Sequence, residues 1–226
     1  MLLYGCIIIQ KYNNGGSMSR PPSGTDLKLK AAGRKLLQAK GITGLSVREA
    51  CREAKVNTGM FHYYFGSKEE FLKAVLKEMY AEFMVNFKAG VSAAGTPRDR
   101  LKNALMEVGK FALSMRRAAP MIFADLAHGK KEAFDFVNAN FTEHVRHIAA
   151  LAEECRPASA VKERSIPFLM LAMIPVMIFP VLMAGVMERN GVKALGGRSL
   201  EKLREEFFSE AGIAERAEIA LRGIGL

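Results

Sequence analysis

Side chains able to bind nucleic acid gather between residues 46 and 68. Thr58, Tyr63 and Tyr64 offer hydroxyl groups, and Arg48 and Lys68 offer positive charge. An arginine can bond N7 and O6 of a guanine, and a lysine at a helix N-terminus neutralises a phosphate. The sequence holds no nucleophile–base pairing, phosphate-binding loop, dinucleotide fingerprint or zinc motif, so we expect binding without catalysis.

Three histidines in the second half of the chain raise the alternative of a metal site. His144 and His147 lie three residues apart, a workable ligand spacing on one helix face, and Asp125 and His128 precede them. No cysteine joins them, because the three cysteines are scattered along the chain. We therefore expect neither metal nor cofactor. Asp125, His128 and His144 could instead orient a polar group of a small effector molecule.

Two short helices are expected to position the polar groups of residues 46–68. Ser46, with Glu49 three residues later, predicts a capping box at the start of the first. A second short helix follows over about residues 58–64. Two such helices joined by a tight turn form a helix-turn-helix, which lays its second helix in the major groove of DNA. The helix before them is expected to end at Gly41.

Residues 27–75 resemble the DNA-binding domain of the tetracycline-repressor (TetR) family of bacterial transcription regulators. The resemblance rests on the first helix ending in Gly41, on Ser46-Val-Arg-Glu49, on Val56, and above all on Gly59-Met-Phe-His-Tyr-Tyr-Phe-Gly-Ser-Lys-Glu69. By position, it implies that four residues lie near base edges: Arg48, Thr58, Gly59 and Tyr63. It implies that four others lie near phosphates: Ser46, His62, Tyr64 and Lys68.

Three residues depart from the family pattern. Lys55 stands where a glycine is common, and we expect it to cost roughly 1 kcal/mol if the turn requires a positive φ. Met60 stands where threonine or serine is usual, and His62 stands where tyrosine is usual. Both lie on the recognition helix, so the operator of another family member cannot be transferred. Phe65 is expected to be a core aromatic and not a DNA contact.

The remaining pattern is helical, which predicts an all-α chain. We expect an N-terminal helix-turn-helix domain of three helices over residues 25–72, then a larger helical domain over 73–226 that begins with a linking helix, 68–89. A second capping box is expected at Ser67, and a helix start at Thr96. Further helices are expected at about 97–116, 119–128, 131–151, 161–188 and 199–221.

The resemblance also implies a homodimer, built by the last two helices, and an effector pocket in the larger domain. The apolar residues expected at the dimer interface are Phe168, Leu169, Phe179, Leu182, Leu203 and Phe207. Residues expected at the effector pocket are Phe123, Asp125, His128, Phe141, His144, Met173 and Met177. Their composition favours an apolar effector. The expected partners are a double-stranded, near-palindromic DNA operator, a second copy of the chain and this effector.

Residues 166–187 form an uncharged run of 22 residues, long enough to cross a membrane. The run is internal and contains three prolines, so a helix buried in the protein or a dimer interface is favoured over a membrane span. Two other functions stay open at this point. One is a membrane-associated regulator anchored by this run, and the other is a helical protein that binds small molecules without reading an operator.

Composition is consistent with a folded, DNA-binding protein of the cytoplasm. The chain has 226 residues, of which half are hydrophobic, and a formal net charge of +10. Residues 1–90 contain 14 lysines and arginines against 7 acidic residues, so the basic excess lies near the helix-turn-helix. Hydrophobic content of this size excludes a mainly disordered chain. Residues 1–24 are expected to be a disordered extension or the product of a misassigned start, with Met18 as the true one.

Overall fold

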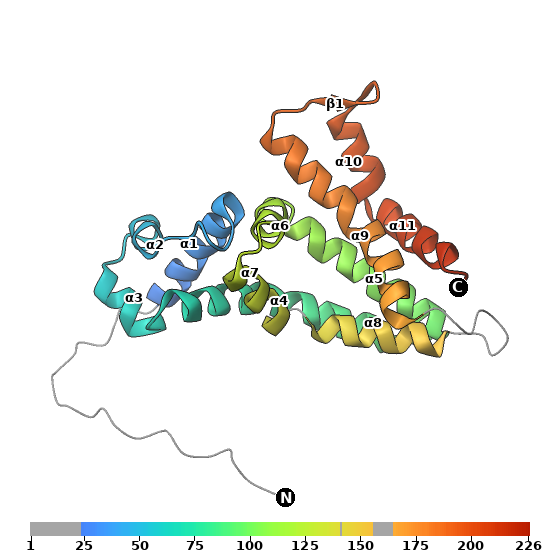
Figure 1. Ribbon diagram of the computed structural model, residues 1–226, viewed down its shortest axis with the longest axis horizontal. Coiled ribbons are helices and arrows are strands. Elements are labelled where there is room, and N and C mark those ends of the chain that lie inside the picture. The colour runs from blue at the N-terminus through green and yellow to red at the C-terminus, as the bar shows by residue number, and fades with distance from the viewer. Residues whose placement is uncertain (1–23, 141, 156–164) are drawn as a thin grey trace, which may run out of the picture.

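Three short helices form a head at one end of an elongated α-helical molecule (Figure 1). The computed structural model describes residues 24–140, 142–155 and 165–226, and the expected extension 1–24 lies almost wholly outside them. The head contains α1 (Thr25–Lys40), α2 (Val47–Ala54) and α3 (Thr58–Phe65). From it, α4 (Lys68–Val91) runs along the length of the molecule. The all-α prediction is confirmed.

Seven further helices form the rest of the described chain. They are α5 (Pro97–Ser114), α6 (Ala119–Ala127), α7 (Lys131–Asn140), α8 (Glu143–Glu154), α9 (Ile166–Arg189), α10 (Leu200–Phe208) and α11 (Glu210–Gly223). Between α9 and α10, β1 (Ala194–Leu195) pairs with β2 (Arg198–Ser199) as a minimal antiparallel hairpin. These strands are too short to produce an alternating pattern, which is why the sequence did not reveal them.

Two apolar cores hold these helices together, and α4 contributes to both. Phe61 and Phe71 anchor the core around the head, which also takes in Met115 from the end of α5. Phe87, Leu105 and Met173 anchor the second core, formed by α4, α5, α8, α9 and α11. Because the first core includes residues far beyond position 72, the head is packed onto its neighbours and is not a free unit.

The hairpin and α10 project away from both cores, while the end of α9 that leads to them packs on α6 (Figure 1). We call this segment, residues 178–208, the arm. None of the residues of α10 is buried. Ser209 then ends α10 and caps α11, because its hydroxyl accepts a hydrogen bond from the Gly212 amide at 3.1 Å. A Cβ atom on Gly212 would lie 2.0 Å from the Glu206 carbonyl oxygen, so only glycine fits this corner.

Two helix predictions need correction. The helix expected at 131–151 is two helices, α7 and α8, with the break near Thr142. The helix expected at 199–221 is also two, because the chain turns at Ser209. The helical spacing of apolar residues continues across both breaks. It therefore did not reveal that the chain changes direction there, which tertiary packing imposes. The first four residues of the helix expected at 161–188 lie outside the described residues.

The predicted helix starts had mixed outcomes. Thr96 and Asp99 form a reciprocal capping box, and the Ser67 hydroxyl accepts from the Glu70 amide. The capping box predicted at Ser46 is wrong, because its side chain makes no capping bond. Glu49 instead pairs with Lys40 Nζ at 2.6 Å, and this contact occupies the carboxylate that the box would have used.

Candidate DNA-binding face and its connections

One face of α3 is anchored and the other is exposed. Phe61 is fully buried and packs edge-to-face on Phe71, which fixes the helix against α4. Asn57, a residue that sequence reasoning missed, caps α3 by accepting a hydrogen bond from the Met60 amide at 2.8 Å. Its signal was an asparagine directly before a helix start. Because this side of α3 is packed against α4, the opposite side of α3 faces solvent.

The turn before α3 contains the only non-glycine residue with positive φ in the described ranges. Lys55 has φ 56° and ψ 45°, which is the left-handed conformation. This agrees with the glycine that is common at this position in the family. A side chain with a Cβ atom adopts this conformation at a cost of roughly 1 kcal/mol. The turn is made nonetheless, because the Lys55 and Val56 amides both bond carbonyls of α2.

The structure exposes most of the residues expected to meet DNA. Five of them are exposed on α2 and α3: Arg48, Thr58, Gly59, His62 and Tyr63. The ring of Tyr63 is 55% exposed, which is unusual for a large aromatic residue. Ser46, Tyr64 and Lys68 are half-buried. Phe65 is half-buried as well and packs on Phe61 and Phe71, so its prediction as a core aromatic is confirmed.

Two of these residues make internal hydrogen bonds. Lys68 Nζ donates to the Thr43 carbonyl oxygen at 3.2 Å, which holds the ammonium group at the start of α4. His62 Nδ1 lies 2.9 Å from the Gly66 carbonyl oxygen. Since a carbonyl can only accept, Nδ1 is the donor in this bond. A carbonyl partner leaves the charge of Lys68 uncompensated.

Ion pairs separate the basic residues of the head into two groups. Lys30, Lys35 and Lys40 pair with carboxylates of Glu78, Glu53 and Glu49. Arg48 and Lys55, in contrast, have no carboxylate within ion-pair distance in the part of the chain that the structure describes. Arg48 and Lys55 are both exposed, so their uncompensated charges are accessible to a partner.

Comparison with known proteins identifies this head. Residues 29–75 match the family described as bacterial regulatory proteins, tetR family. The head is therefore similar to the DNA-binding domain of the TetR family. The transcriptional regulator BetI of Rhizobium meliloti (strain 1021) is 32% identical over 77 residues, which are 34% of this chain and 37% of BetI. The transcriptional repressor NemR of Escherichia coli (strain K12) is 36% identical over 74 residues, 32% of this chain and 37% of NemR.

Little more than a third of the length of either relative is matched. The fold extends further. The fatty acid degradation regulator FadR from Bacillus halodurans superposes with a TM-score of 0.66 over 92% of this chain and 99% of its own, at 15% identity. Identity this low shows a shared fold and carries no information about a shared effector or operator.

The TetR head is tied to α6 by one carboxylate. Asp125 Oδ2 accepts from the Ile42 and Thr43 amides at 3.2 Å each, and Oδ1 accepts from the Thr43 hydroxyl at 2.7 Å. We call these bonds the latch. They occupy Asp125, so its prediction as an effector contact needs correction. Gly41, with φ 76°, ends α1 as predicted and leads the chain into the latch.

Arg189, at the end of α9, holds the TetR head at a second point. Its guanidinium donates to the carbonyl oxygens of Gln38 and Ala39 on α1 and of Arg117 after α5. The three acceptors come from the C-terminal ends of two helices, where carbonyl groups lack intrahelical partners. Sequence reasoning missed this residue, since nothing in its neighbourhood marks a contact 150 positions away.

The other residues expected at an effector pocket are not brought together. Met173 and Met177 are fully buried in the second core, whereas Phe123 is 55% exposed. His128 is exposed and bonds the Ala124 carbonyl, and Phe141 lies outside the described residues. His144 Nδ1 lies 2.9 Å from the Tyr80 hydroxyl, and burial lowers its pKa to about 4. Of the two histidines in this set, His144 is therefore neutral and half-buried beside aromatic rings, whereas His128 is exposed.

An apolar stripe follows the exposed side of α9. Its members recur at intervals of three or four residues, as one face of a helix requires: Phe168, Leu171, Pro175, Phe179, Leu182 and Val186. Leu171 is 75% exposed and Phe179 58%. Only 28% of the most apolar part of α9 is buried, so the expectation of a buried helix is only half correct. Length and composition also allow this helix to cross a membrane.

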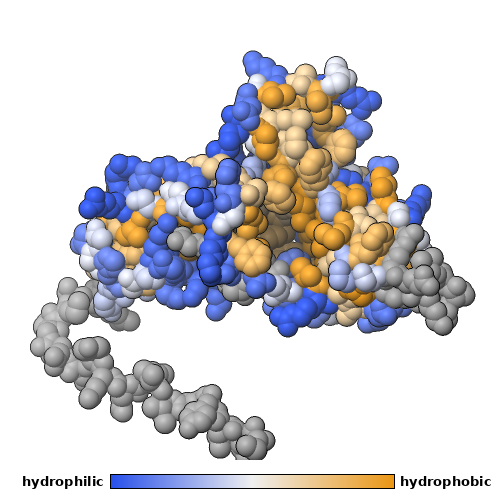
Figure 2. All heavy atoms as spheres, in the orientation of Figure 1, coloured by the Kyte–Doolittle hydropathy of each residue, from blue (hydrophilic) through white to orange (hydrophobic). Residues whose placement is uncertain are grey.

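The residues expected at the dimer interface divide between this stripe and the core. Phe168, Phe179 and Leu182 belong to the stripe, and Leu203 and Phe207 lie on α10, where Phe207 is 38% exposed. Leu169 needs correction, because it is 6% exposed and packs in the core of its own subunit. Figure 2 shows apolar side chains spread over the arm and over the surface beneath it.

Proposed function

We propose that this protein is a DNA-binding transcriptional regulator of the cytoplasm that acts without catalysis. The observation that carries the proposal is the exposed face of α3, with Thr58, Gly59 and Tyr63, together with the exposed and uncompensated charge of Arg48 on α2. The match of the head to the TetR family supports it independently. Hydroxyl groups and an arginine fork suit base edges, while Lys68 and the charge of the turn suit phosphates.

We further propose that the regulator is a homodimer joined along α9. The exposed stripe has the spacing of a helix-packing face, and Leu171 and Phe179 within it are 75% and 58% exposed. Large apolar patches on a soluble protein mark places of association. Two-fold symmetry then gives two recognition helices and a near-palindromic operator. If the protein were found only in membranes, α9 would be an anchor and this proposal would be wrong.

Repression and release by an apolar effector complete the proposal. NemR is a repressor by name, which makes repression a reasonable expectation for this chain. The latch and Arg189 connect the TetR head to α6 and α9, so a ligand that displaced either helix would move the recognition face. Differential affinity for the two arrangements would release the operator.

A selection from random duplex DNA tests the proposal. The full chain is incubated with the pool at about 150 mM salt, and the retained DNA is sequenced. We expect an enriched inverted repeat. Tyr63→Ala should change the preferred sequence, whereas Val85→Ala, on an exposed residue of α4 outside the head, should leave it unchanged. A soluble dimer that enriches no sequence would contradict operator reading and favour a helical ligand-binding protein.

A further inference from the structure

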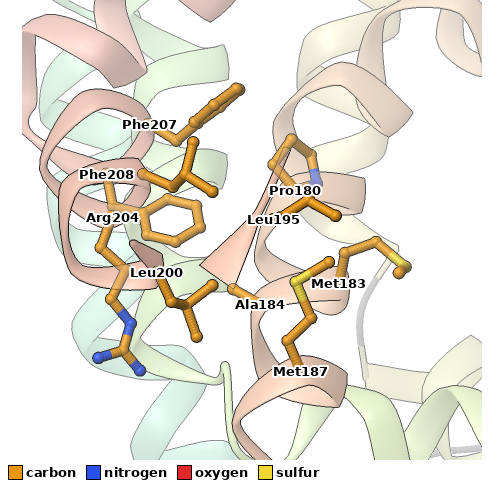
Figure 3. A pocket seen from close by; sticks show the side chains of 10 residues that line it. Pro180, Met183, Ala184, Met187, Leu195, Leu200, Arg204, Phe207 and Phe208 are labelled. Carbon is orange, nitrogen blue, oxygen red and sulfur yellow. The ribbon is translucent and has the colours of Figure 1, made fainter. Parts of the chain in front are cut away.

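An apolar pocket opens between the two helices of the arm (Figure 3). Pro180, Met183 and Met187 of α9 form one wall, and Leu200 and Phe208 of α10 form the other. The pocket encloses about 130 Å³. An engineered cavity of roughly 150 Å³ in another protein accepts a benzene molecule. The space between α9 and α10 therefore suits one aromatic ring or a short branched alkyl group.

The charge at the edge of this pocket is unbalanced. Arg204 of α10 lines the pocket, and its guanidinium pairs with Glu188 near the end of α9. The same carboxylate lies 3.6 Å from Nε of Arg116. Two guanidinium groups thus share one carboxylate, and none of the described residues that line the pocket is acidic. One positive charge remains uncompensated at the mouth.

A third guanidinium lies behind the pocket wall. Arg216 of α11 is 5% exposed, and its Cζ atom is 5.7 Å from the ring centre of Phe208. Its Nη1 donates to the Val176 and Met177 carbonyls, the first of which is freed because Pro180 has no amide hydrogen. Nε and Nη2 have no hydrogen-bond partner within the described chain. Arginine stays charged when buried, and an unpaired buried charge is costly.

We propose that the arm pocket binds a small amphipathic anion, a carboxylate carrying an apolar group about the size of a phenyl ring. The apolar group fills the space between α9 and α10, and the carboxylate lies at Arg204. Glu188 remains paired with Arg116. An anion at this position offsets the positive charge of Arg204 and Arg116, which share the single carboxylate of Glu188, whereas a neutral ligand does not. Binding at this site requires neither DNA nor a second subunit.

Methionine methyl groups provide the probe, because Met183 and Met187 line the pocket. The full chain, labelled at its methionine methyl carbons, is titrated with 3-phenylpropionate, and 3-phenylpropanol and 3-phenylpropylamine serve as neutral and cationic counterparts. We expect the Met183 and Met187 signals to shift, while Met60 on α3 does not. A charge-assisted hydrogen bond should make the acid bind about tenfold more tightly than the alcohol.

Two arginines of the arm give a matched pair of variants. Arg204→Gln should weaken binding of the acid about tenfold and leave the alcohol unaffected. Arg198→Gln is the control, because Arg198 also pairs with a glutamate of the arm, Glu206 at 2.7 Å, but does not line the pocket. Should Arg204→Gln fail to fold, Leu195→Trp fills the mouth from a side chain that is 53% exposed and should weaken both ligands.

Three results would overturn the proposal. Equal binding of acid and alcohol, or an unchanged affinity in Arg204→Gln, would exclude an anionic ligand. No shift of Met183 and Met187 at millimolar ligand would exclude the pocket as a site. Shifts that follow protein concentration without ligand would mean that a second subunit fills the pocket. None of these results bears on operator selection, so the two proposals can fail separately.

Discussion

The TetR head and the arm are both small helical units, but they bury their apolar residues differently. In the head, Phe61 and Phe71 are fully buried, and lysines of α1 are paired with carboxylates of α2 and α4. In the arm, α10 has no buried residue, and apolar side chains such as Phe179 and Leu195 are more than half exposed. The head is thus stabilised within its own chain, whereas the arm carries apolar surface that only a partner or ligand can cover.

Removing the anchor of α3 should have the largest effect. Phe61→Ala leaves a cavity at the centre of the head and should lower the free energy of unfolding by about 3–5 kcal/mol, with loss of DNA binding. Urea denaturation, monitored by circular dichroism, measures this free energy of unfolding. Tyr63→Ala, on the exposed side of the same helix, is the control and should change stability by less than about 0.5 kcal/mol. Similar losses of stability in both variants would contradict the assignment of one anchored and one exposed side to α3.

A charge on the arm should instead separate the subunits. Phe179→Asp places a carboxylate in the apolar stripe and should weaken dimerisation about 100-fold, while each subunit keeps its helical content. Light scattering over a concentration series measures the dissociation constant. Val85→Asp, on an exposed residue of α4 outside the stripe, is the control. An unchanged dimer in Phe179→Asp would show that α9 does not join the subunits.

Loss of the latch tests how far the head depends on its neighbours. Asp125→Ala leaves two amides and one hydroxyl of residues 42–43 without their acceptor and should cost about 1–3 kcal/mol. We expect faster hydrogen exchange at Ile42 and Thr43, but not within α3. Asp135→Ala, which removes an exposed ion pair with Lys131, is the control. Unchanged exchange at both amides would mean that the latch bonds contribute nothing in solution.

Relief of backbone strain should have the smallest effect and the opposite sign. Lys55→Gly should raise the free energy of unfolding by about 1 kcal/mol, because glycine adopts φ 56° without a steric penalty. Lys55→Ala keeps the Cβ atom and should give no such gain. Equal stability of the glycine and alanine variants would indicate that the turn is relaxed in solution.

Local signals predicted the head well and the connections poorly. The helix bounds of the head, the end of α1 at Gly41 and the role of Phe65 followed from caps, apolar spacing and a family resemblance. Asp125 was expected to face an effector, yet it binds residues more than 80 positions earlier in the chain. The break at Ser209 likewise depends on the close approach of Gly212 to Glu206. Contacts between distant residues, or at a sharp turn between two helices, produce no periodic pattern in a sequence.

The last turn of α9 gives three consecutive residues three different neighbours. Met187 lines the arm pocket, Glu188 pairs with Arg204 of α10, and Arg189 donates to the end of α1. A helical turn is stiff over a distance of about 5 Å. The contact of α9 with α10 and its contact with the first helix of the TetR head are made by adjacent residues of one helical turn. We therefore expect a displacement of α10 that moves Glu188 to move Arg189, and with it the contact to the head.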